Sequence, residues 1–86
     1  MDNAYLGIIM RKERKKQGLT QADLAEKAGV ATMTIRRYES GDRKPRLGEA
    51  LKIAGALGLA LKDLLSGPEF ERFVREIKRQ AALLQD

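Results

Sequence analysis

The 86-residue chain contains neither cysteine nor histidine. Without cysteine it cannot form a disulfide or bind a metal through thiolates, which fits a reducing compartment. Without histidine it lacks the commonest general base of enzymes and the usual nitrogen ligand of zinc. Glycine-rich phosphate-binding loops and nucleophile motifs are also missing. We therefore expect a protein that is not an enzyme and that carries no metal or cofactor.

Long apolar segments are absent as well. No apolar run approaches the roughly 18 to 20 residues that a membrane-spanning helix needs. The short apolar patch near the N-terminus is followed by the basic segment 11–16 and by no cleavage pattern, so we expect no secretory signal. These features predict a cytoplasmic protein without a membrane partner. A chain of this size forms one small domain and often recruits a second copy.

Positive charge is concentrated in one part of the sequence. The formal net charge is +5, and residues 11–46 hold eleven Lys and Arg against five Asp and Glu. Residues 68–86 hold four of each sign and are neutral. A basic front indicates a surface that meets a polyanion, whereas a solvated surface with no anionic partner is the alternative.

The apolar periodicity is helical along nearly the whole chain, and no segment alternates like a strand. Thr20 and Asp23 have the spacing of a capping box, and Gly29 marks the end of the helix that they open. The sequence thus predicts an all-α fold, with helices over residues 4–17, 20–28, 32–39, 47–57 and 61–65 and a longer one from residue 68.

The expected fourth helix contains Gly48 and Gly55, each of which costs up to about 1 kcal/mol relative to alanine. A close approach of another helix would explain either glycine. The inward face of this helix is predicted to consist of Leu47, Ala50, Leu51, Ala54 and Leu57.

The expected third helix has two chemically distinct faces. On a helical wheel, Ile35 and Tyr38 lie on the inward side. The outward arc of about 140° holds threonine, methionine and arginine side chains, which suit the major groove of DNA because arginine pairs with guanine and methyl groups contact thymine. A solvated helix with no specific contact is the alternative. The candidate base-reading residues are Thr32, Met33, Arg36 and Arg37.

Polar residues on both sides of this helix are suited to hold the DNA backbone. One lies at the start of the second helix, where a side chain and unpaired N–H groups can bind phosphate. The others follow the third helix. The candidate phosphate-binding residues are Gln21, Ser40, Arg43, Lys44 and Arg46.

An ordered set of motifs resembles the phage-repressor-like, or Xre/Cro-type, helix-turn-helix regulators over about residues 5–66. The set is specific because its elements occur together and in order. They are Leu19-Thr20-Gln21, Leu24-Ala25, Ala28-Gly29-Val30, Thr34-Ile35, Tyr38-Glu39-Ser40-Gly41, Lys44-Pro45, Leu51-Lys52-Ile53-Ala54 and Ala56-Leu57-Gly58.

The resemblance implies a five-helix DNA-binding domain in which the outward face of the third helix reads bases and Gln21 contacts a phosphate. It also implies an internal ion pair between Arg14 and Glu39 that fixes the reading helix. The chain departs from the family at Ala31, where a capping serine or threonine is usual. Each lost cap costs about 0.5 to 2 kcal/mol, and Arg46 and Ala60 also replace expected caps.

We divide the chain into a helix-turn-helix domain at residues 1–67 and an additional amphipathic helix at residues 68–86. Ion pairs are expected between Glu71 and Arg75 and between Arg72 and Glu76. The apolar residues of this helix lie within an arc of about 100° and at a spacing close to a heptad. They are Phe70, Phe73, Val74, Ile77, Ala81 and Leu84.

Two interpretations of this last helix stay open. It either pairs with its twin to form a dimer, which we favour, or folds back as a sixth helix that completes the core. The chain is also compatible with a longer protein that carries a ligand-binding or oligomerisation domain.

The sequence as a whole predicts a small transcriptional regulator, a repressor, that binds double-stranded operator DNA as a homodimer. One alternative is a DNA-binding antitoxin that holds a toxin through the last helix. Another is a protein-bridging adaptor that uses the same fold without reading DNA sequence.

Overall fold

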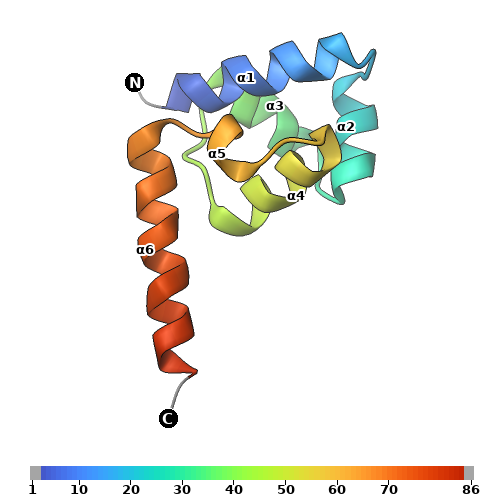
Figure 1. Cartoon of the computed structure of the whole chain (residues 1–86). Helices are drawn as coiled ribbons and strands as arrows, with labels where there is room; N and C mark the ends of the chain where they lie inside the picture. Colours follow the sequence, from blue (N-terminus) through green and yellow to red (C-terminus); the bar gives the residue numbers. More distant parts are fainter. Residues whose placement is uncertain (1–2, 85–86) are drawn as a thin grey trace.

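The computed structural model describes residues 3–84, which form six helices and no strand (Figure 1). Every expected helix is present, and each begins within one residue of its predicted start, so the all-α prediction is confirmed. Residues 85 and 86 of the expected tail lie outside the described residues. The helices are α1 (Asn3–Lys16), α2 (Gln21–Ala28), α3 (Thr32–Ser40), α4 (Leu47–Leu57), α5 (Leu61–Leu64) and α6 (Gly67–Leu83).

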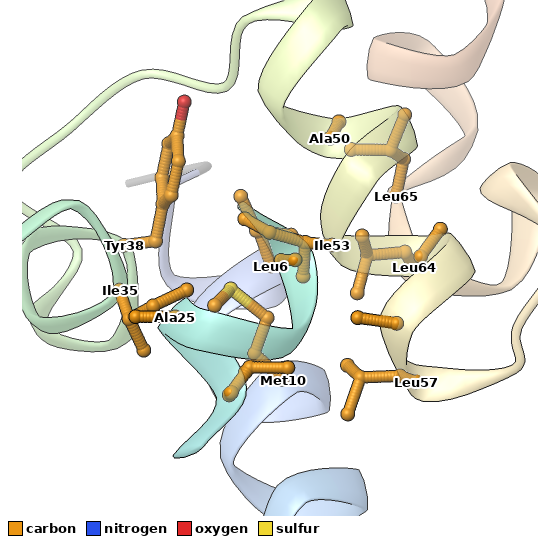
Figure 2. Packing of buried hydrophobic residues seen from close by; sticks show 14 of the residues in the cluster. Leu6, Met10, Ala25, Ile35, Tyr38, Ala50, Ile53, Leu57, Leu64 and Leu65 are labelled. Carbon is orange, nitrogen blue, oxygen red and sulfur yellow. The ribbon is translucent and has the colours of Figure 1, made fainter. Parts of the chain in front are cut away.

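Helices α1 to α5 pack around one apolar core (Figure 2). Met10 of α1, Ile35 of α3 and Ile53 of α4 have no exposed side-chain surface. Burying a side chain of this size stabilises the folded state by about 1.5 to 3 kcal/mol. Helix α3 packs against α1 and α2, and its buried side chains join the core, which fixes the helix that is expected to read DNA. No helix within residues 3–84 is long and apolar enough to cross a membrane.

The buried face of α4 differs from the predicted one. Leu51, expected inside, is 49% exposed, while Ile53 and Ala56 are buried. The prediction centred the inward arc on the line from Leu47 to Ala54. In the fold α4 contacts α2, α5 and α1. The side of α4 that these helices cover is centred nearer to Ile53 than the predicted inward face.

Helices α1 and α3 cross closely at Gly7, which is buried. A Cβ atom at this position would lie 2.4 Å from the Tyr38 carbonyl oxygen and 2.8 Å from that of Glu39. Any side chain at Gly7 would therefore push the two helices apart. By contrast, apart from the adjacent residues and backbone of α4 itself, no heavy atom lies within 4 Å of a Cβ added at Gly48 or Gly55, so neither glycine of α4 marks a close crossing.

Helix α6 begins on the core and then extends away from it (Figure 1). Phe73 is 1% exposed and Phe70 packs partly against the core. Val74 is half-buried, Ala81 is exposed, and Ile77 and Leu84 are 46% and 85% exposed. The interpretation of α6 as a core-completing helix thus holds only for its first two turns. Beyond them its apolar stripe is uncovered.

The charges on α6 also pair differently from the prediction. Arg72 forms an ion pair with Glu69 at 2.5 Å, one turn earlier in the helix. Within residues 3–84, neither Glu71 with Arg75 nor Arg72 with Glu76 forms an ion pair. The Arg72 guanidinium also donates to the Pro45 carbonyl oxygen at 3.2 Å, so this side chain is held between Glu69 and the loop.

Candidate DNA interface

The start of α2 is fixed by a complete capping box. The Asp23 backbone N–H donates to Thr20 Oγ1 at 3.0 Å, and the Thr20 backbone N–H donates to Asp23 Oδ2 at 2.9 Å. The hydrogen bond from the Thr20 backbone lowers the pKa of the Asp23 carboxyl, since it stabilises the charged form. The shorter aspartate therefore completes the box that glutamate or glutamine usually forms.

The turn between α2 and α3 is built on Gly29, whose φ of 73° lies in the left-handed region. Glycine adopts this conformation without the steric cost that a Cβ atom brings. The Val30 backbone N–H then donates to the Ala25 carbonyl oxygen at 3.0 Å and closes the end of α2. Ala25 is 2% exposed, so its small side chain permits the approach of the two helices.

Helix α3 presents its candidate base-reading residues on the outer surface. Met33 is 47% exposed, Arg36 and Arg37 are exposed, and Thr32 is partly exposed. The opposite face is anchored in the domain by Ile35 and Tyr38, both buried, together with Thr34 at 8% exposure. The four outward side chains thus form one accessible face on a firmly held helix.

The ion pair of Arg14 with Glu39 holds α3 in position from its buried side. Arg14 Nε lies 2.7 Å from Glu39 Oε2 and Nη2 lies 2.9 Å from Oε1, while Nη1 donates to the Leu19 carbonyl oxygen at 2.8 Å. The two charged side chains are only 9% and 5% exposed. The hydrogen bond with Glu39 raises the pKa of Arg14. This network joins the end of α1, the entry to α2 and the end of α3.

Gln21 belongs to the same network. Its Nε2 donates to Glu39 Oε1 at 3.1 Å, a contact that sequence reasoning did not predict. An amide group carries two N–H donors, and this bond uses one of them. The second side-chain donor and the unpaired backbone N–H at the start of α2 are the groups that Gln21 can offer to a phosphate.

The loop after α3 is held by the Tyr38 hydroxyl group. This hydroxyl donates to Glu49 Oε1 at 2.5 Å and accepts from the Arg46 backbone N–H at 3.2 Å. Burial, together with the hydrogen bond to Glu49, raises the pKa of Tyr38 to about 12. These two hydrogen bonds fix the backbone of the loop between Gly41, whose φ is 80°, and the start of α4.

Two candidate phosphate-binding residues are engaged within the protein. The Arg43 guanidinium lies 5.7 Å from the centre of the Tyr38 ring and 3.4 Å from Glu49 Oε2. The Ser40 hydroxyl donates to the Arg37 carbonyl oxygen at 3.0 Å, so its single proton is used. The Ser40 hydroxyl thus has no second proton to donate in this conformation, whereas the Arg43 guanidinium has five N–H donors and keeps others for a phosphate.

Lys44 and Arg46 are exposed in the same loop, and neither forms an ion pair within the described part of the chain. The structure therefore brings together one outward helix face and the candidate phosphate contacts, whose role stays a prediction. Sequence reasoning missed Glu49 and Gly7. A glutamate in the first turn of a helix that follows a basic loop was the available signal for Glu49.

Comparison with known proteins bears on this arrangement. Residues 10–64 match the helix-turn-helix family HTH_3. The chain is 48% identical over 50 residues to an uncharacterised HTH-type transcriptional regulator of Methanothermobacter thermautotrophicus, covering 58% of this chain and 72% of that protein. It is 33% identical over 55 residues to the cryptic phage CTXphi transcriptional repressor RstR of Vibrio cholerae, covering 64% of this chain. This second match spans 49% of the repressor, about half of its length.

A solved structure has the same fold. The restriction-modification controller protein C.AhdI from Aeromonas hydrophila superposes with a TM-score of 0.71 and 31% identity, over 74% of this chain and 97% of that chain. The family match over residues 10–64 includes α2, α3 and the turn between them. The chain belongs to the phage-repressor-like, or Xre/Cro-type, helix-turn-helix family of DNA-binding transcriptional regulators.

Proposed function

We propose that this regulator recognises a specific operator sequence as a homodimer and represses transcription. The observation that carries the proposal is the outer face of α3, where two arginines stand beside a threonine and a methionine on a helix anchored by the Arg14–Glu39 pair. An α-helix fits the major groove of DNA, in which every base pair presents a distinct pattern of donors and acceptors.

Each outward side chain has a definite partner in this proposal. Arg36 and Arg37 donate to O6 and N7 of guanine, the commonest specific contact in the major groove. The methyl groups of Thr32 and Met33 lie against thymine methyls. Gln21 on one side of α3, and Lys44 and Arg46 on the other, contact phosphates and set the register of the helix on the duplex.

The apolar stripe of α6, which is exposed beyond the first two turns, supports the homodimer. Phe70, Val74, Ile77, Ala81 and Leu84 follow alternating steps of four and three residues, as in a coiled-coil seam. Ile77 and Leu84 are exposed in one copy, and the segment 68–86 is electrically neutral, so two copies would meet without net repulsion. Two-fold pairing would suit half-sites about 34 Å apart, one helical turn of DNA.

The names of relatives agree with a repressive or controlling role. RstR is a transcriptional repressor, and C.AhdI is a controller protein of a restriction-modification system. Neither name identifies an operator for this chain. The operator is therefore the first property to determine.

In vitro selection of bound duplexes from a random library tests the proposal. The expected product is an inverted repeat with half-sites about one helical turn apart. Sedimentation of the protein alone should give a dimer, and Ile77→Asp should give a monomer because it places charge in the apolar seam. Selection of no common sequence would contradict base reading, and a monomeric wild type would contradict the homodimer.

The uncovered stripe of α6 also favours a second candidate, a DNA-binding antitoxin whose α6 holds a toxin. In that case Ile77→Asp would abolish capture of the toxin encoded beside it and leave DNA binding by the monomer. A bridging adaptor would keep its protein partner after Arg36→Ala plus Arg37→Ala and would show no preference among duplexes.

A further inference from the structure

Two oppositely charged side chains flank the apolar stripe of α6 on the same side. With Phe70 as the origin of a helical wheel, Glu71 lies at about 100° and Lys78 at about 80°, while the stripe is centred near 0°. Both side chains are exposed, and neither forms an ion pair within residues 3–84. A negative and a positive charge, one heptad apart, thus border the stripe and are accessible to a second molecule.

The other border of the stripe is covered by the domain to which the helix belongs. Phe73, which lies about 60° from Phe70 on that side, is 1% exposed and is part of the apolar core. Beyond its first two turns α6 projects away from the domain (Figure 1), and Ile77 is 46% exposed there. A second helix therefore has access to the stripe along the border that carries Glu71 and Lys78.

The spacing of the stripe gives each of its residues a place in a coiled-coil heptad. Glu71 and Lys78 both fall at position e, one of the two flanking positions whose charges set the choice and orientation of a partner helix. The stripe itself alternates between positions d and a, in the order Phe70, Val74, Ile77, Ala81 and Leu84.

The two charges distinguish a parallel from an antiparallel pair of α6 helices. In a parallel pair an e residue lies beside a g residue of its twin, so Lys78 would face the partner's Phe73, which is buried in its own domain. In an antiparallel pair the e residues of the two helices face each other. Glu71 of each copy then meets Lys78 of the other, and both charges are paired.

One antiparallel register makes both of these contacts. It sets Phe70 opposite the partner's Ala81 and Val74 opposite the partner's Ile77, so the largest side chain of the stripe meets the smallest. A slip of one heptad in either direction would set Glu71 against Glu71 or Lys78 against Lys78, and like charges at such a distance repel. The charge pattern therefore selects one orientation and one register.

We propose that α6 pairs with α6 of a second copy in the antiparallel orientation, with two Glu71–Lys78 ion pairs along the apolar stripe. This inference rests on the proposed homodimer and specifies how its two copies meet. The two-fold axis then crosses the helix pair at the level of residues 75–76, near the middle of α6, and the two domains lie toward opposite ends of the pair. Parallel and slipped pairings are disfavoured because they leave charges unmatched.

Charge reversal tests the two ion pairs. Glu71→Lys alone or Lys78→Glu alone should raise the dissociation constant of the dimer by roughly 10- to 30-fold, because each turns two attractive pairs into two repulsive ones. Sedimentation measures this constant. Both substitutions in one chain should restore the wild-type value. Arg79→Glu, which reverses an exposed charge opposite the stripe, should leave it unchanged.

A mixture of variants tests whether the ion pairs join two copies. Glu71→Lys mixed with Lys78→Glu should form a heterodimer about as tight as the wild-type dimer, since both pairs are then attractive. Glu71→Lys mixed with Arg79→Glu is the matched control, because the two chains differ in net charge by the same amount. This control should dimerise less tightly, since one of its two pairs is repulsive.

A single introduced cysteine tests the orientation, because the chain has none of its own. In the antiparallel register the two copies of residue 81 lie eleven positions apart along the helices, or about 16 Å. A disulfide joins Cα atoms no more than about 7 Å apart. Ala81→Cys should therefore stay uncrosslinked under oxidising conditions, whereas a parallel pair would set its two thiols opposite each other and crosslink rapidly.

The outcomes separate this inference from the proposed function. Circular dichroism should show that every variant keeps its helical content. A wild-type dimer that is insensitive to both single charge reversals, or a rapid disulfide in Ala81→Cys, would overturn the antiparallel arrangement and leave the homodimer standing. A monomeric wild-type protein would instead contradict the homodimer on which the inference rests.

Discussion

Arg14 and Glu39 lie 25 positions apart in the sequence and form a bidentate ion pair, with N–O distances of 2.7 and 2.9 Å. Both side chains are nearly buried. The pair fastens α3 to α1, so the direction in which Arg36 and Arg37 point depends on residues that face away from the duplex.

Arg14→Met should lower the free energy of unfolding by about 3 to 5 kcal/mol, because it leaves the Glu39 carboxylate buried without its cation. Urea denaturation measures the change. Arg14→Met combined with Glu39→Leu should recover much of the loss, since no unpaired charge then remains. A loss below about 1 kcal/mol in the single variant would show that the pair does not hold α3.

Gly7→Ala should destabilise the protein by at least about 1 to 3 kcal/mol, the usual cost of overpacking, because its Cβ meets backbone oxygens that cannot rotate away. Gly55→Ala is the matched control, as the position is open and the substitution should stabilise α4 by up to about 1 kcal/mol. Thermal unfolding of both variants distinguishes them. Equal effects would contradict the close crossing of α1 and α3.

Ala31→Ser should stabilise the start of α3 by about 0.5 to 2 kcal/mol. Ala31 has the extended backbone of an N-cap, with φ of −71° and ψ of 147°, but no side-chain acceptor. For a domain of this size each kcal/mol raises Tm by about 4 to 8 °C. An unchanged Tm in a calorimetric scan would mean that another group already satisfies these N–H donors.

The pKa of Tyr38 gives a prediction at alkaline pH. Its folded-state pKa of about 12 lies above the ordinary value of 10.0, so the unfolded chain loses the proton first. Stability from this group is complete below pH 10 and is lost as pH rises toward 12, by about 2 to 3 kcal/mol. Unfolding of wild type and Tyr38→Phe between pH 9 and 12 should therefore differ in slope. Parallel curves would contradict the burial of this hydroxyl.

Local signals made the helices predictable from the sequence. Thr20 with Asp23 marked the start of α2 and Gly29 marked its end, because capping depends on neighbouring residues. The two faces of α3 followed from helical periodicity, and the pairing of Arg14 with Glu39 followed from the family resemblance.

Features that depend on how helices meet were not predictable in this way. Leu51 was assigned to the core because the wheel of α4 alone does not say where its neighbours lie. The role of Gly7 was not predicted, because only the close approach of α3 makes a residue without a Cβ atom necessary at this position. The internal contacts of Arg43 with Glu49 and of Ser40 with the Arg37 carbonyl oxygen were not predicted either, and the assignment of both residues to phosphates stays a prediction.

The most direct test of the account is the affinity of Arg36→Ala plus Arg37→Ala for the selected operator and for a scrambled duplex. Lys62→Gln plus Arg79→Gln serves as the control for lost charge. We predict that the arginine variant stays folded and binds both duplexes alike, while the control keeps the wild-type preference. Undiminished preference for the operator in the arginine variant would contradict the claim that α3 reads the bases.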